Sequence, residues 1–528
     1  MDDFGADTTP AQAPDETRPH LPMRSGLPQP SAAWPPPSAA PPRPFAWTPT
    51  TFPTPAPRWR RVLVALVGPA LVFGAIGVVV VIALANRGAD TSHPDEWDPR
   101  VTEIATMVST TRELAWEHPV YIDFLPEDEF VALFDAPFAV APTAEDTELA
   151  LAFGRVYDAM GLAVDYDPAA GEAAVSAVTT LGFYSLDNDR IYVRGDVLTP
   201  AVRVVIAHEL THALQAQHFE LEVGGPNDLE LRAIVEADAM RVEGVFRGTL
   251  STQEQQAADS GNELGSAAAD DLTDVPWTVL EQRYAPYVLG PLLVNDVYAT
   301  AGNAGVDRLI LNPPAEEVLL SPWLLGELQS TPPVRLAPPA DTTELQPVQA
   351  ASPLEMLVML DAWLPWQQAR SALDGWAGGL SATYLRDADD RVCFAAALAF
   401  DDSAQPFVDA IEDWATAAGS SVAPTVDGAT VTFEVCERGD GAQAPAEPVI
   451  APLLALQIES DAISIAGDEP TGQERDGYRC LAATLIDDPA AAPLLVLAEL
   501  TSEQQVVFDA QAALATDACG VPPLNRQP

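Results

Sequence analysis

The sequence predicts an α+β protein that is preceded by accessory segments at its N-terminus. Three observations support this prediction: residues 1–61 are rich in proline, residues 62–85 form an unbroken apolar stretch, and helical and strand patterns alternate from residue 100 onward. The 528 residues exceed one compact domain, and 48% of them are hydrophobic, which is enough for a sizeable core. We expect five parts: 1–61, 62–85, 86–99 (a linker), 100–350 and 351–528.

Acidic residues dominate the charge of the chain. There are 26 basic and 77 acidic residues, which gives a formal net charge of −51. A surface of this sign repels phosphate backbones, so nucleic acid is not an expected partner.

Residues 1–61 predict a disordered tail. Sixteen of the 50 prolines precede Arg58, and no hydrophobic periodicity accompanies them. Such a composition favours polyproline II segments over a packed core. A plain spacer is the simpler interpretation, and the alternative is a segment that binds a partner with aromatic grooves.

Residues 62–85 predict a transmembrane helix. At about 1.5 Å per residue, these 24 residues exceed the roughly 30 Å hydrocarbon core. Arg58, Arg60 and Arg61 precede the stretch and an acidic segment follows it, so the positive-inside rule leaves the tail, and any partner of it, in the cytoplasm. The expected location is the cell membrane, with a single pass through the lipid bilayer and an extracytoplasmic C-terminal domain.

Helix and strand signals follow the linker. Apolar spacing and alternation predict helices at 101–114, 127–134 and 145–160, a strand at 119–125 and a hairpin at 183–193. Thr199 and Pro200 then predict a helix start, because threonine caps an N-terminus and proline fits the first helical position. The helix that begins there, 201–219, contains the residues with the clearest chemical pattern.

His208, Glu209 and His212 form an HExxH sequence inside that helix. Two histidines four residues apart project from one helix face, so both rings can bind one metal ion. Glu209 is rotated by about 100° from His208, which lets it hold a water beside the ion without binding the ion itself. Zinc suits imidazole ligands, and a catalytic zinc has three protein ligands plus water. The pattern therefore predicts a Zn²⁺ site with Glu209 as a catalytic residue.

A third ligand is needed, and the remaining histidines are poorly placed to supply it. A second predicted helix, 227–246, contains Glu236 among apolar neighbours, where an unpaired carboxylate would be costly. A metal ion would resolve that cost, so Glu236 is the expected ligand, and Glu230 and Glu243 are its rivals. Asp238 is a candidate for orienting a ligand histidine, with a surface role as the equal alternative.

The sequence HELTHALQAQHF at 208–219, followed by VEADA at 235–239, resembles the gluzincin branch of zinc metallopeptidases. More closely, it is similar to bacterial membrane-anchored proteins of uncertain function that carry HELTHALQ and EGDA motifs. The resemblance covers roughly residues 100–436 and departs from the pattern at Ala237, where those proteins usually have glycine. Further similar segments are found at 182–193, 283–294, 312–322 and 374–379.

The resemblance implies a zincin-like metallopeptidase domain at 100–350 that acts on a peptide or protein substrate. Zinc on the three ligands would activate water and polarise the scissile carbonyl. Glu209 would accept the proton of the water and deliver it to the leaving amine. The oxyanion needs a further donor, for which Tyr287 is the expected residue, with Tyr284 and Tyr298 as alternatives.

The remaining segments predict a loop at 251–274, helices around the downstream tyrosines and a small α+β unit near the C-terminus. The expected elements are helices at 284–295 and 304–311, a proline-rich crossing at 332–350, a helix at 354–374, a strand at 393–400, a helix at 405–418, a hairpin turned at 427–428, a strand at 494–497 and a helix after Thr501.

Four cysteines predict two disulfides. All of them lie on the side of the apolar stretch that is expected to be oxidising, and their number is even. Of the three pairings we favour the sequential one, Cys393–Cys436 and Cys480–Cys519. A four-cysteine zinc site is the rival interpretation, but the sequence contains no CxxC pair.

Two other functions stay open from the sequence. One is a catalytically inactive zincin-fold surface binding module, which the intact HExxH argues against and the lack of a clear oxyanion donor keeps open. The other is an anchored structural or signalling protein that acts through its proline-rich tail.

Overall fold

The structure is a computed structural model, and all the residues that it describes belong to the compact unit formed by residues 56–528. The described residues are 92–135, 152, 154–168, 171, 175, 180–221, 228–267, 272, 275–326, 334–337, 341–439, 441–467, 470–497 and 500–522.

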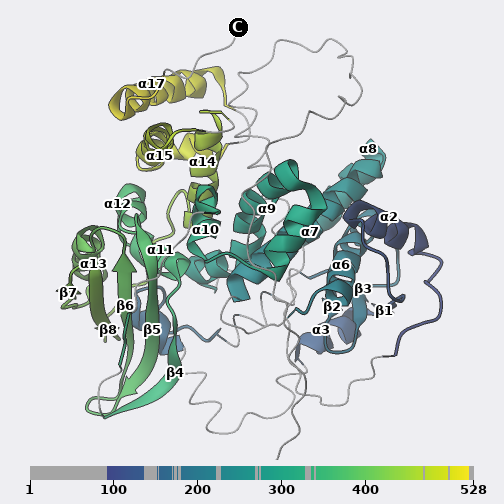
Figure 1. Ribbon diagram of the computed structural model, residues 1–528, viewed down its shortest axis with the longest axis horizontal. Helices are drawn as coiled ribbons and strands as arrows, with labels where there is room; N and C mark the ends of the chain where they lie inside the picture. The colour runs from purple at the N-terminus through teal and green to yellow at the C-terminus, as the bar shows by residue number, and fades with distance from the viewer. Residues whose placement is uncertain are drawn as a thin grey trace, which may run out of the picture. The chain divides into compact units, whose positions relative to one another are not determined.

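The HExxH helix, α6, lies among the helices and a small sheet of the first part of this unit (Figure 1). The sheet has the strand order β1-β3-β2, with β1 parallel and β2 antiparallel to β3. Helices α2, α7 and α8 and strands β2 and β3 all contact α6. The elements are α2 (Thr102–Arg112), β1 (Tyr121–Leu125), α3 (Glu127–Asp135), β2 (Gly182–Ser185), β3 (Arg190–Arg194), α6 (Pro200–His218), α7 (Asp228–Thr249), α8 (Thr252–Ala267) and α9 (Trp277–Leu311).

Helix α6 begins where the sequence predicts it. The hydroxyl of Thr199 accepts a 3.2 Å hydrogen bond from the backbone N–H of Val202, and Pro200 occupies the first turn. All but one of the residues from 201 to 215 are buried, because neighbouring elements contact the helix from several sides. The polar HExxH side chains therefore point into the protein interior, where they need partners.

Helices α7 and α9 pack closely at Gly290. A Cβ at this position would lie 2.0 Å from the carbonyl oxygen of Ala233 and 3.0 Å from the Cβ of Ala237, so glycine is required. Ala237 thus packs against α9. The close approach also brings Tyr287, one turn before Gly290, towards the face of α7 that carries Glu236.

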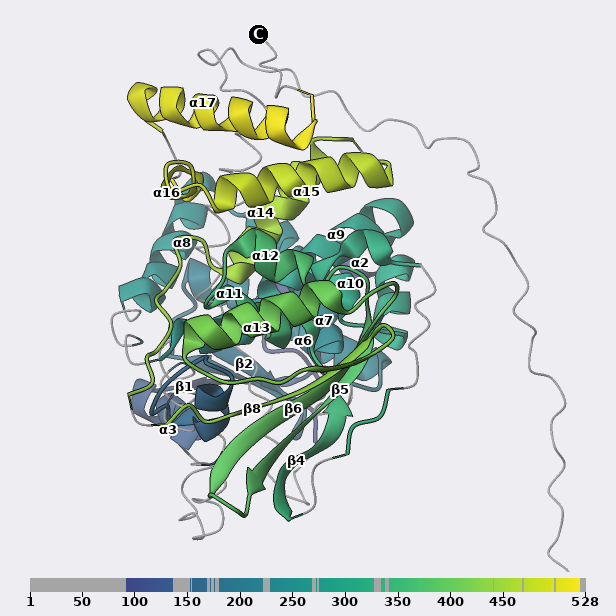
Figure 2. The same cartoon turned by 90° about the vertical axis from the view of Figure 1, so that its left-hand side faces the viewer.

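The second part of the unit is built around a five-stranded antiparallel sheet with the order β4-β5-β6-β8-β7. Helix α13 covers one face of this sheet (Figure 2). There the ring of Phe407 lies 5.8 Å from that of Phe400 and 5.6 Å from that of Phe433. The elements are α10 (Glu317–Leu320), η3 (Pro322–Leu324), β4 (Thr342–Ala350), α11 (Pro353–Asp361), α12 (Trp366–Ser371), β5 (Trp376–Arg386), β6 (Arg391–Phe400), α13 (Gln405–Ala418), β7 (Thr425–Asp427), β8 (Thr430–Cys436), α14 (Pro452–Ser464), α15 (Gly472–Ile486), α16 (Ala492–Leu495) and α17 (Ser502–Cys519).

Both disulfides have the predicted pairing. Cys393–Cys436 joins β6 to β8 at positions that are direct register partners, and Cys480–Cys519 joins α15 to α17. Neither pair therefore offers free thiolates to a metal.

Several predicted elements are wrong. The expected loop at 251–274 contains α8, whose start is stabilised by hydrogen bonds between the Ser251 and Glu254 side chains and backbone. The proline-rich crossing at 332–350 ends in strand β4, which pairs with β5. The expected strand at 494–497 overlaps helix α16. The two helices expected at 284–295 and 304–311 are one long element with a non-helical residue at Gly302.

The mixed α+β class agrees with the structure, but the membrane part of the prediction is corrected. No helix within the described ranges is both long and apolar enough to cross a bilayer. The longest of them, α9, carries charged residues such as Asp296 and Asp307. This finding is against a transmembrane helix and against the single-pass location at a cell membrane, and we withdraw both expectations. The stretch 62–85 and the tail 1–61 lie outside the described residues.

Candidate metal centre

Three side-chain atoms converge between α6 and α7. Nε2 of His208 and Nε2 of His212 lie 3.1 Å apart, and Oε2 of Glu236 lies 3.1 Å from the first and 3.3 Å from the second. Tetrahedral zinc with bond lengths of 2.0–2.1 Å separates its ligand atoms by about 3.3 Å. The spacing of the three atoms therefore fits one zinc ion, and it does so with the residues that the sequence predicts.

Hydrogen bonds on the far side of each ring fix which nitrogen faces the convergence point. Nδ1–H of His208 donates to Oε2 of Glu243 over 3.1 Å, and Nδ1–H of His212 donates to Oε1 of Gln215 over 3.0 Å. Each Nε2 then presents a lone pair towards Glu236. Two lone pairs and a carboxylate oxygen at this distance repel one another unless positive charge lies between them.

The pKa shifts show the same demand for positive charge. Burial opposes protonation of His208 and His212, yet the nearby carboxylates raise the pKa of both rings, and that of His208 well above its ordinary range. Burial acts to raise the pKa of Glu236, but the two histidines bring it below its ordinary range. Glu236, Glu209 and Glu243 are all buried, so a divalent cation would offset a concentration of negative charge.

Glu243 and Glu230 were the rival ligands. Glu243 does not face the convergence point but accepts the hydrogen bond from His208, so it supports a ligand from the second layer around the site. Such a carboxylate–histidine pair orients the ring and strengthens its basicity towards a metal. Glu230 is also buried, and it does not belong to the group of His208, His212 and Glu236 whose ligand atoms lie within 4.8 Å of one another.

Glu209 lies beside the three atoms without joining them. Its Oε2 accepts a 2.8 Å hydrogen bond from the backbone N–H of Tyr184 on β2, and its Oε1 has no hydrogen-bond partner within the described part of the chain. Burial raises the pKa of Glu209 to about 7. One oxygen is therefore anchored to the sheet while the other is available for a proton near neutral pH.

Tyr287 is the downstream tyrosine that reaches the site. Its hydroxyl donates a 3.0 Å hydrogen bond to Oε1 of Glu236, so it orients the ligand carboxylate. Tyr298 lies 11 residues further along α9, about 16 Å away at the rise of an α-helix, and its ring contacts the Arg241 guanidinium at 4.0 Å. Tyr284 packs against the hydrophobic core. These contacts place Tyr287 alone of the three beside the ligands.

Asp238 reaches a ligand histidine only indirectly. Its Oδ2 accepts a 2.9 Å hydrogen bond from Nε2 of Gln215, and Oε1 of the same Gln215 faces His212. Gln215 was not predicted from the sequence, although it lies three residues after His212 and hence on the same face of α6. Arg112 on α2 also belongs to this group, and nothing in the local sequence could associate it with the motif.

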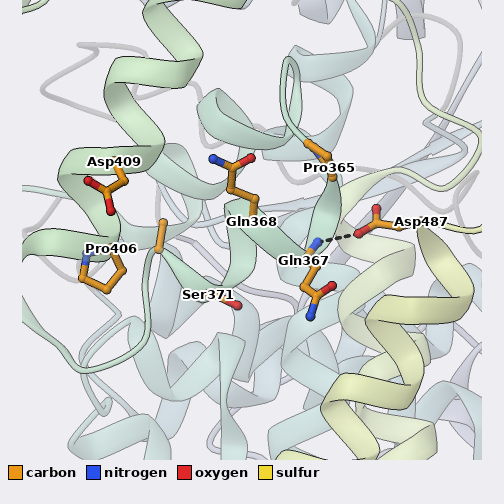
Figure 3. A pocket seen from close by; sticks show the side chains of 8 residues that line it. Pro365, Gln367, Gln368, Ser371, Pro406, Asp409 and Asp487 are labelled. Carbon is orange, nitrogen blue, oxygen red and sulfur yellow. Dashed lines mark hydrogen bonds between the residues drawn. The ribbon is translucent and has the colours of Figure 1, made fainter. Parts of the chain in front are cut away.

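Elsewhere in the described ranges, the candidates for a second site are weaker. The potential ligand atoms of Cys393, Glu434 and Cys436 lie within 4.8 Å of one another, but both sulfurs belong to the disulfide. A shallow pocket of about 430 Å³ lies between α12, α13 and α15 (Figure 3). Its Asp487 already accepts hydrogen bonds from the backbone N–H groups of Trp366 and Gln367.

Comparisons of this chain with protein-family models, with curated proteins and with solved structures found no match. The resemblance to gluzincins therefore depends on the motif residues of the sequence alone.

Proposed function

We propose that this protein is a zinc-dependent metallopeptidase. The observation that carries the proposal is the convergence of His208 Nε2, His212 Nε2 and Glu236 Oε2 within 3.3 Å of one another. Beside them lies Oε1 of Glu209, for which the described residues provide no hydrogen-bond partner. Two imidazoles and one carboxylate are a donor set that catalytic zinc uses in peptidases.

When bound, zinc would act as a Lewis acid that lowers the pKa of water and polarises a carbonyl. The proton transfers would be carried out by the protein. Glu209 would accept a proton from that water on Oε1, while the N–H of Tyr184 holds its other oxygen in place. It would then return this proton to the amine that leaves as the peptide bond breaks.

Tyr287 would hold the carboxylate of Glu236 in the geometry of a ligand. Glu243 and Gln215 would hold the two rings so that each Nε2 lone pair faces the ion. These buried partners leave the site little freedom to rearrange, which is a requirement for efficient catalysis.

The test is Glu209→Gln in the full chain, with fluorescein-labelled casein as the probe and zinc content measured in parallel. The variant keeps the size of the side chain and its bond to Tyr184 but cannot act as a base. We expect zinc to stay bound while casein hydrolysis falls by about 10²–10⁴-fold. Glu412→Gln, which changes an exposed glutamate on α13, is the control and should hydrolyse casein normally. Casein hydrolysis by Glu209→Gln at the wild-type rate would contradict the proposed role of Glu209 as a base.

A second candidate is a zinc-containing binding module without catalysis. The burial of the ligands favours it, since His208, His212 and Glu236 are 0%, 6% and 3% exposed. A wild-type protein that contains zinc but hydrolyses neither casein nor a mixed peptide library would support this candidate over the peptidase.

A further inference from the structure

A chain of buried polar contacts leads from His212 away from the metal centre. Gln215 is its first member and is fully buried. Its Nε2 donates to Oδ2 of Asp238 over 2.9 Å and to the carbonyl oxygen of Val235 over 3.1 Å. With two acceptors on that side, the amide has only one orientation that satisfies its hydrogen bonds, so Oε1 must face His212.

The orientation of Gln215 decides the tautomer of His212. Since Oε1 can only accept, Nδ1 of His212 carries the proton, and Nε2 keeps the lone pair that a metal requires. If the amide turned over, its NH₂ group would face Nδ1, and the proton would move to Nε2, which is the nitrogen beside Glu236. The acceptor at Asp238 is thus what makes the ring of His212 a ligand.

Asp238 is in turn held between two arginines. Nε of Arg112 lies 2.7 Å from Oδ2, the same oxygen that accepts from Gln215, and a guanidinium nitrogen of Arg241 lies 2.9 Å from Oδ1. The Asp238 side chain is completely buried, so it can only remain in place if these charges are paired.

Arg112 comes from a distant part of the chain and has two further contacts of its own. Its side chain is 0% exposed, and its remaining nitrogens donate to Oδ1 of Asn303 over 3.0 Å and to Oδ1 of Asp307 over 2.7 Å. Both acceptors lie on α9. A buried arginine that connects α2, α7 and α9 at one point holds the Asp238 carboxylate in a single position.

We propose that Arg112 is a positioning residue of the metal centre, acting through Asp238 and Gln215 to hold His212 in its Nδ1–H tautomer. The inference rests on the proposed metal site and adds to it a residue 100 positions away in the sequence. Without Arg112, the Asp238 carboxylate can turn away from Gln215, and the amide loses the contact that sets its orientation.

The experiment is a double-mutant cycle on zinc affinity in the full chain, with Zn²⁺ and a chromophoric chelator as the competing probe. We expect Arg112→Met and Gln215→Met each to weaken zinc binding by about 10–100-fold, and the double variant to bind no more weakly than Gln215→Met alone. Arg112→Lys should recover part of the affinity because it restores a cation beside Asp238.

Arg370→Met is the matched control. Arg370 is also a buried arginine, paired with Glu459 at 3.1 Å, but it connects α12 to α14. Its replacement should lower stability and leave zinc affinity unchanged. Unchanged affinity in Arg112→Met, or effects that simply add in the double variant, would overturn the inference.

A second measurement covers the case in which Arg112→Met fails to fold. Nitrogen NMR of ¹⁵N-histidine-labelled wild-type protein without added metal, at a pH where the ring of His212 is neutral, reports its protonated ring nitrogen, and the signal is identified by its loss in His212→Gln. Protonation at Nδ1 agrees with the inference, and protonation at Nε2 overturns it. Wild-type protein that binds no zinc would instead overturn the proposed function, and the NMR result would still test the tautomer.

Discussion

Nδ1 of His208 and Oε2 of Glu243 are joined by a 3.1 Å hydrogen bond, although the two residues lie on different helices. Glu243 follows Glu236 by seven residues, or two helical turns, so both carboxylates face α6 from the same side of α7. Glu236 lies beside Nε2 of both histidines. Glu243 accepts the hydrogen bond from Nδ1 of His208. Helix α7 therefore carries the proposed ligand Glu236 and also Glu243, which orients His208, another proposed ligand.

Replacing Glu243 should weaken zinc binding without removing a ligand. In Glu243→Met, the ring of His208 loses its acceptor, so we expect the zinc affinity to fall by about 10–100-fold. Glu243→Gln keeps an acceptor, so its zinc affinity should fall much less. Chelator competition measures both values. Glu459→Gln changes a similarly buried glutamate on α14 and should bind zinc as the wild type does; an equal loss there would show that the effect is unspecific.

Tyr287→Phe removes one hydroxyl from the site. The variant loses the 3.0 Å hydrogen bond to Glu236, which should lower the free energy of unfolding by about 1 kcal/mol. Because the carboxylate becomes less well oriented, we also expect weaker zinc binding. Urea unfolding and chelator competition on the same preparation check the two effects.

The control for this prediction is Tyr298→Phe. Tyr298 lies on the same helix but contacts Arg241 through its ring, which phenylalanine preserves. Its zinc affinity should not change. If Tyr287→Phe binds zinc as tightly as Tyr298→Phe does, the hydroxyl does not support the ligand.

A buried carboxylate far from the metal centre should make stability depend on pH. Asp461 on α14 is buried, its Oδ2 has no partner in the described part of the chain, and burial raises its pKa to about 7. In the unfolded chain its pKa is about 3.9. Between these values the unfolded state has released the proton and the folded state still holds it, so this residue makes stability fall as pH rises from about 4 to 7.

Asp461→Asn removes this penalty. At each pH we compare the free energy of unfolding of the variant with that of the wild type. The difference in favour of the variant should be about 2 kcal/mol larger at pH 8 than at pH 5. Urea titrations at the two pH values measure the difference. Asp409→Asn, an exposed aspartate on α13, should show no such pH dependence. A gain in Asp461→Asn that is equal at both pH values would contradict the explanation.

The sequence predicted best where one local signal was enough. The cap at Thr199 and Pro200 located the start of α6, and the spacing of His208 and His212 placed both rings on one face. The cysteine pairing was also correct. The helix cap and the histidine spacing involve few residues and depend little on the rest of the fold.

Elements that depend on tertiary contacts were missed. Helix α8 is mostly polar, and it is stabilised by ion pairs such as Arg203–Glu254 and Arg247–Asp259 across helix boundaries. The helices expected at 284–295 and 304–311 belong to one longer element, α9, which packs on α7 around Gly290. Likewise, Arg112 could not be associated with the site from sequence, because only folding brings α2 to Asp238.

The central claim is that His208, His212 and Glu236 hold one zinc ion, and metal content tests it most directly. We would measure zinc by mass spectrometry on the purified full chain beside His208→Ala, Glu236→Ala and His218→Ala, the last being an exposed histidine of the same helix. We predict about one zinc per chain in the wild type and His218→Ala, and none in the other two. A folded wild-type protein without zinc, or zinc retained by both ligand variants, would contradict the claim.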